Sequence, residues 1–118
     1  MSLADDLQAA TLEFDGEAGR ARMRFSGEEL FFKGHFPDGP VLPAVVQVAA
    51  AVHFAGRVLG REVKLAEVSC AKFMNPTGPG RELTLALTLE EAEEGCTKVK
   101  AQIREGDKDV AEFTLRVV

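Results

Sequence analysis

One histidine, His35, lies in a loop whose backbone is restricted by prolines. The prolines of residues 37–43 fix their own φ at about −65° and push the residue before each of them toward an extended conformation. A histidine held in this way suits proton abstraction, because its ordinary pKa lies close to neutral pH. The rings of Phe32 and Phe36 flank it in sequence and would limit the access of water. The segment therefore predicts a catalytic base, with a histidine on a surface loop as the alternative.

A long apolar helix is predicted directly after this loop, from about Pro43 to Leu59. Pro43 stands where a first helical residue is favoured, and Gly60 stands where a left-handed residue would end the helix. A bilayer span needs about 20 apolar residues, and this segment is shorter and charged. We expect a core helix that other elements enclose, because it has no hydrophilic face and only three polar residues, Gln47, His53 and Arg57.

Alternating apolar and polar residues predict strands before and after this helix. The order is two strands, the histidine loop, the long helix and then four strands, with a tight turn over 105–108 between the last two. One antiparallel sheet with an apolar face, wrapped around the helix, would place all of them in one core. We therefore expect a single α+β domain over residues 1–118, with strands near 11–14, 20–25, 63–73, 83–89, 97–103 and 110–118.

The composition agrees with one globular domain of ordinary solubility. The 118 residues are 46% hydrophobic and 28% charged, and the formal net charge is −5. A nucleic-acid partner is not expected, because it would require a basic face. The first residues lack the basic start and apolar run of a secretory signal, so we expect a cytoplasmic protein without a membrane segment.

The two cysteines, Cys70 and Cys96, show no spacing typical of a metal site. With only two histidines in the chain, neither a metal nor another cofactor is expected. We interpret both cysteines as reduced and structural, and Cys70 as a small core residue.

Two separated stretches carry a family resemblance. The first is Gly-His-Phe-Pro-x-x-Pro-Val-Leu-Pro-x-Val over 34–45, and the second is Ala-Lys-Phe-Met-Asn-Pro-Thr-Gly-Pro-Gly-Arg-Glu-Leu over 71–83. Both resemble bacterial 3-hydroxyacyl-acyl-carrier-protein dehydratases, and the short N-terminus is most similar to the compact aryl-polyene-type (ApeI-like) members. The resemblance implies a hotdog fold, in which an antiparallel sheet wraps around one central helix in a dimer. Dimerisation is also expected on physical grounds, because a lone sheet of this kind leaves an edge strand exposed, which a second protomer would cover.

The resemblance implies a hydro-lyase of fatty-acid or polyketide-type biosynthesis that needs no cofactor. Its partner would be an acyl carrier protein bearing a 3-hydroxyacyl thioester, and its product a trans-2-enoyl thioester. His35 would take the α-proton, and the backbone N–H of Ala44, where the family prefers Gly, would polarise the thioester carbonyl. The expected substrate-binding residues are Phe32, Gly34, Phe36, Pro43, Ala44, Gln47 and Ala49.

One position departs from the family in a way that bears on catalysis. The dehydratases place a Glu or Asp on the central helix fourteen residues after the histidine, where this chain has Ala49. Loss of one positioned acid or base typically costs about 10²–10⁴ in rate. His53 lies four residues beyond Ala49, on the same helix face and about 5.4 Å further along the axis, so it is our first candidate for a second catalytic group. A core histidine bonded to a backbone carbonyl is the alternative.

Three other interpretations stay open. His35 alone would shuttle the proton from carbon to the leaving hydroxyl. In a second interpretation the chain is catalytically impaired, binds acyl thioesters and acts as a partner of another dehydratase. The expected assembly is a homodimer, with a heterodimer with a second hotdog subunit as the alternative. A hotdog acyl thioesterase ranks last, because that class usually relies on a carboxylate near the central helix and lacks this proline-bounded histidine loop, although fold alone does not exclude it.

Overall fold

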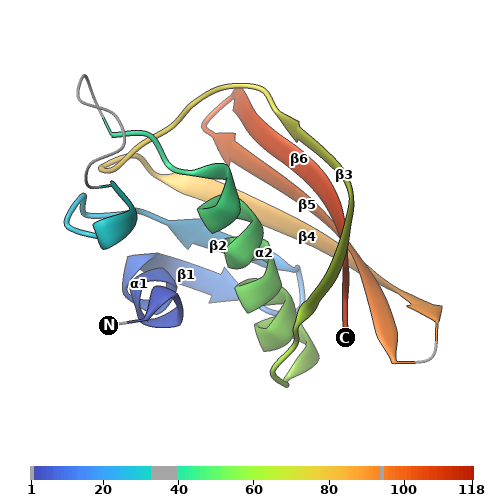
Figure 1. Ribbon diagram of the computed structural model, residues 1–118. Helices are drawn as coiled ribbons and strands as arrows, with labels where there is room; N and C mark the ends of the chain where they lie inside the picture. The colour runs from blue at the N-terminus through green and yellow to red at the C-terminus, as the bar shows by residue number, and fades with distance from the viewer. Residues whose placement is uncertain (1, 33–39, 94) are drawn as a thin grey trace.

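The computed structural model describes residues 2–32, 40–93 and 95–118. The predicted order of two strands, a long helix and four strands is confirmed (Figure 1). The structure also contains two short helices that were not predicted from the sequence. The elements are α1 (Leu3–Ala10), β1 (Thr11–Asp15), β2 (Arg20–Met23), the 3₁₀ helix η1 (Leu30–Phe32), α2 (Ala44–Leu59), β3 (Leu65–Phe73), β4 (Leu83–Glu93), β5 (Cys96–Glu105) and β6 (Lys108–Val117).

The strands form one antiparallel sheet in the order β1-β2-β4-β5-β6-β3. Helix α2 lies against one face of this curved sheet, over β4 and β5, as the expected hotdog arrangement requires (Figure 1). The alternating leucines of β4 are buried, and Leu85 pairs with Ile103 of β5. Since side chains alternate between the two faces of a strand, this one register turns a whole row of apolar side chains toward α2.

Helix α2 begins one residue later than predicted. Pro43 has φ −63° and ψ 147°, which is extended, so it precedes the helix and Ala44 is the first helical residue. The carbonyl of Pro43 accepts hydrogen bonds from the N–H groups of Val46 and Gln47, both at 3.1 Å. At the other end Gly60 has φ 72° and closes the helix in the left-handed conformation, as predicted.

Helix α1 was missed because residues 1–6 were considered only as a possible signal sequence. The hydroxyl of Ser2 accepts a bond from the N–H of Asp5, and the Asp5 carboxylate accepts one from the N–H of Ser2, each at 3.2 Å. This reciprocal capping of Ser2-x-x-Asp5 was the sequence signal that could have predicted the helix. Leu7 is buried on the side of α1 that packs beside α2.

Strand β3 is exposed along its whole length, at one edge of the sheet. Cys70 is therefore exposed rather than a core residue, because β3 has no further strand beside it. The expected enclosure of α2 is also incomplete, since Val45 is 76% exposed in the single chain. No helix in the described ranges has the length and apolar character needed to cross a bilayer.

Candidate functional site

An apolar groove of about 500 Å³ runs between α2 and β3. It starts at Ala44, the first residue of α2, whose backbone N–H has no partner within the helix. We call it the apolar groove; its lining residues are Ala44, Val45, Val48, Ala49 and Val52 of α2 and Leu65, Val68, Ala71 and Phe73 of β3. A cavity lined in this way suits an alkyl chain, and it places a hydrogen-bond donor at one end.

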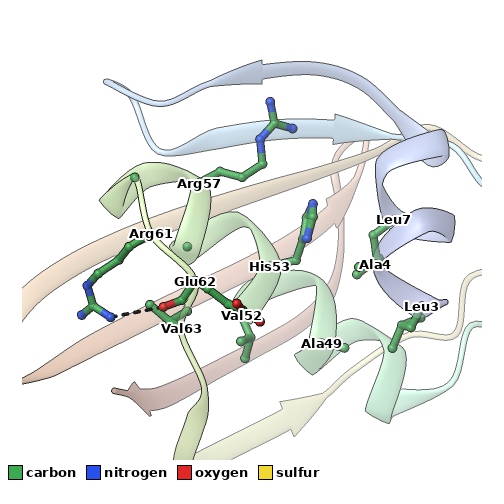
Figure 2. A pocket seen from close by; sticks show the side chains of 12 residues that line it. Leu3, Ala4, Leu7, Ala49, Val52, His53, Arg57, Arg61, Glu62 and Val63 are labelled. Carbon is green, nitrogen blue, oxygen red and sulfur yellow. Dashed lines mark hydrogen bonds between the residues drawn. The ribbon is translucent and has the colours of Figure 1, made fainter.

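A second cavity, of about 560 Å³, lies between α1, α2 and the segment after α2 (Figure 2). Ala49 and Val52 line both cavities, so one wall is common to them. We call the second cavity the His53 pocket; its other lining residues are Leu3, Ala4 and Leu7 of α1, His53, Gly56 and Arg57 of α2, and Gly60, Arg61, Glu62 and Val63 after α2. It differs from the apolar groove in having charged and hydrogen-bonding side chains in its wall.

The His53 side chain extends from α2 toward α1 (Figure 2). Its ring packs edge-on against Phe54, with the ring centroids 5.0 Å apart. The Nε2 atom is buried and has no hydrogen-bond partner among the described residues. Burial lowers the pKa of His53 from its ordinary value, and the positive charge of Arg57 lowers it further. The imidazole is therefore mainly neutral at neutral pH and holds an unused polar atom.

Arg57 lies one helical turn beyond His53 and stacks its guanidinium on Phe14 of β1, 4.3 Å from the ring centroid. This cation–π contact fixes the side chain without neutralising its charge. Within the described part of the chain Arg57 forms no ion pair with a carboxylate. A positive charge is thus held beside the His53 pocket.

The start of α2 is anchored through Leu42. The N–H of Leu42 donates to the carbonyl of Thr77 at 2.7 Å, and the Leu42 carbonyl accepts from Nε2 of Gln47 at 3.2 Å. The Thr77 hydroxyl in turn donates to Glu105 at the end of β5, at 2.8 Å. These contacts tie the helix start, and with it Ala44, to the far end of the sheet.

The predicted site residues fall into three groups. His35, Gly34 and Phe36 lie outside the described residues, so their predicted roles stay predictions. Ala44 and Ala49 line the apolar groove, while Pro43 and Gln47 shape the helix start. Phe32 is buried among aromatic rings, 6.1 Å from Phe25 and 4.8 Å from Phe31 between ring centroids.

The contribution of α1 and of residues 60–63 to the cavity around His53 was not predicted from the sequence. His53 was considered only in relation to its own helix. No spacing in the sequence could have indicated that α1 would pack beside His53, because that contact depends on the tertiary fold.

Known proteins match most of the chain. The model of the family described as ApeI dehydratase, ApeI-like, matches residues 11–113. The 3-hydroxyacyl-acyl-carrier-protein dehydratase FabZ of Gluconobacter oxydans is 35% identical over 95 residues, which cover 73% of this chain and 56% of that enzyme. The FabZ of Klebsiella pneumoniae is 31% identical over 114 residues, covering 88% of this chain and 76% of that enzyme.

Solved structures share the fold at lower identity. The dehydratase heterocomplex ApeI:P from Xenorhabdus doucetiae has a TM-score of 0.74 at 21% identity, covering 91% of this chain and 95% of that chain. The fluoroacetyl-CoA thioesterase FlK has a TM-score of 0.70 at 13% identity, covering 84% and 83%. These likenesses support the hotdog architecture, which dehydratases and thioesterases share. The family match over residues 11–113 is the more specific finding, and by it the chain belongs to the ApeI-like dehydratase family.

Proposed function

We propose that this chain acts in the cytoplasm as a hydro-lyase on 3-hydroxyacyl thioesters carried by acyl carrier protein and forms trans-2-enoyl thioesters. The observation that carries the proposal is the apolar groove, which begins at Ala44, the first residue of α2, whose N–H has no partner within the helix. This arrangement suits a thioester carbonyl at Ala44 with the acyl chain running along α2. The FabZ relatives, whose name describes this reaction, support the same assignment.

In the proposed reaction His35 takes a proton from C2 of the substrate. The electrons of the C2–H bond form the C2=C3 double bond, and the C3–O bond breaks. The N–H of Ala44 stabilises the charge that develops on the thioester oxygen, with the positive end of the α2 dipole behind it. The leaving hydroxide needs a proton to depart as water.

The residue at position 49 bears on which group donates that proton. Ala49 lines the groove with a methyl group, where the family resemblance places a carboxyl group. His53, one turn further, is one possible donor, but its lowered pKa leaves little imidazolium at neutral pH. Return of the proton by His35 itself is a second route. A carboxyl group from a partner subunit is the third.

A partner would cover surface that the single chain leaves exposed. Strand β3 presents an unpaired edge, and beside it Val45 and Val68 expose apolar side chains to solvent. A second hotdog chain has both a strand edge and an apolar helix, so it would extend the sheet at β3 and close the apolar groove into a tunnel. The partner would be a second copy or a different hotdog subunit that carries the missing carboxyl group. The similar structure from Xenorhabdus doucetiae is a dehydratase heterocomplex, ApeI:P, and supports the second choice.

The test is dehydration of a carrier-bound 3-hydroxyacyl thioester, followed by mass spectrometry of the carrier. Turnover by the purified chain would support a donor within the homodimer. A silent chain that becomes active as Ala49→Glu would support an intact acyl site that awaits a partner's carboxyl group. Ala18→Glu, which adds the same charge in the exposed turn between β1 and β2, outside both cavities and away from β3, is the matched control. Absence of product from every form, including a mixture with an ApeI-like subunit that is inactive by itself, would contradict the proposal.

A further inference from the structure

The two cavities along α2 share one wall and differ in chemistry. The apolar groove starts at Ala44, and the His53 pocket continues from the shared residues Ala49 and Val52. His53 is nine positions after Ala44, which is about 13 Å along the helix axis. An extended acyl chain whose thioester lies at Ala44 would therefore leave apolar surroundings before it reaches His53.

The far end of this path is poorly suited to a methyl group. The buried Nε2 of His53 has no hydrogen-bond partner in the described structure, and an apolar ligand end would leave it without one. Arg57 holds a positive charge nearby, fixed on Phe14 but not neutralised by a carboxylate of the described chain. Both residues lie on one face of α2, since they are four positions apart.

We propose that the His53 pocket binds a carboxylate at the far end of the acyl chain, so that the favoured substrates are monothioesters of dicarboxylic acids. The Nε2–H of His53 donates to the carboxylate, and the Arg57 guanidinium balances its charge. This inference rests on the proposed function, because it takes the ligand to be an acyl thioester with its carbonyl at Ala44.

The expected preference for a carboxylate-ended ligand over a methyl-ended one depends on the strength of the hydrogen bond that the carboxylate accepts. A hydrogen bond to a charged group contributes more than one between neutral groups, and leaving a buried donor unpaired carries its own cost. We expect the carboxylate-ended ligand to bind about 10- to 100-fold more tightly than a methyl-ended ligand of equal length. Salt should reduce the difference only in part, because the pocket wall is partly buried.

Calorimetric binding of saturated thioesters tests this without any turnover. The probes are the pantetheine thioester of decanoic acid, the monothioester of decanedioic acid, and the ω-hydroxydecanoyl thioester. We expect the decanedioyl ligand to bind most tightly and the hydroxyl-ended ligand to fall between the others. Equal affinities of the three ligands would overturn this inference but would still agree with an acyl chain bound in the apolar groove. Failure of all three to bind would overturn the inference and the proposed function together.

Three variants locate the effect. His53→Leu and Arg57→Met should each remove most of the preference for the carboxylate end, and Arg57→Met keeps an apolar side chain against Phe14. His53→Gln should retain part of it through its amide N–H. Lys64→Gln removes an exposed positive charge directly after the pocket residue Val63, at a position that does not line the pocket, and should leave the preference unchanged. A preference that survives both His53→Leu and Arg57→Met in folded protein would contradict the assignment.

Discussion

Gln47 donates a hydrogen bond from its side-chain Nε2 to the backbone carbonyl of Leu42, across 3.2 Å. Gln47 is buried in a helix whose other inward residues are apolar, and this bond satisfies its amide nitrogen, while its Oε1 has no partner among the described residues. It holds the segment that leads from the histidine loop into α2. The position of the Ala44 N–H therefore depends on a side chain one turn into the helix.

Gln47→Leu should lower the free energy of unfolding by about 1–3 kcal/mol, because the Leu42 carbonyl would lose its buried partner. We also expect a lower kcat in any active form of the protein, because Ala44 would be less firmly placed. Urea denaturation and the dehydration assay would measure the two effects. Gln102→Leu, on the half-exposed outer side of β5, is the control. Equal stability of the two variants would argue against the anchoring role.

The lowered pKa of His53 predicts a dependence of stability on pH. Below the ordinary value of 6.5 the unfolded chain gains a proton at this histidine more readily than the folded chain does. The contribution to stability is thus present above 6.5 and is lost as the pH falls from there toward the lowered folded pKa. His53→Gln should lack this pH-dependent contribution, so its unfolding free energy should fall less than that of the wild type between about pH 7 and pH 5. Parallel curves for the two proteins, measured by denaturant titration, would show that the shift is absent.

The exposed apolar face of β3 predicts that a charge there will prevent dimerisation. Val68 lines the apolar groove from β3 and is 44% exposed. Val68→Lys should shift the protein to monomer in analytical ultracentrifugation, because a partner would have to bury the ammonium group. Leu12→Lys changes a residue of similar exposure, 45%, on the opposite edge strand β1 and should remain dimeric. A monomeric wild type would contradict the homodimer and would leave a different hotdog subunit as the partner.

Close packing at Gly78 predicts intolerance of a side chain. A Cβ at this position would lie 2.6 Å from the carbonyl oxygen of Pro40. Gly78→Ala should therefore force the chain around Pro40 away and destabilise the protein by about 1–3 kcal/mol. Gly16→Ala, whose Cβ would meet only the Phe14 ring at 3.4 Å, should have a smaller effect in thermal unfolding.

Local sequence patterns were sufficient for the sheet and the long helix. The alternation in β4, β5 and β6 indicated the buried face correctly, since Val99 pairs with Leu115 and Ala101 with Phe113, and all four side chains are buried. The capping pair of Ser2 and Asp5 was equally local and was overlooked.

The features that could not be predicted depend on neighbours distant in the chain. Cys70 looked like a core residue by its type, but its strand lies at the edge of the sheet. Pro43 fits the first helical position by its φ, but its ψ of 147° leaves it outside α2, in the segment that Thr77 holds through Leu42. The surroundings of His53 likewise required α1 to be in place.

The most direct test of the proposed chemistry is the dependence of dehydration on His35. Carrier-bound 3-hydroxyacyl thioester would be given to the wild type, to Ala49→Glu and to each of them with His35→Ala added, with circular dichroism to check the fold. We predict that any enoyl product formed with His35 disappears from the folded His35→Ala forms. Undiminished turnover without His35 would contradict its role as the base.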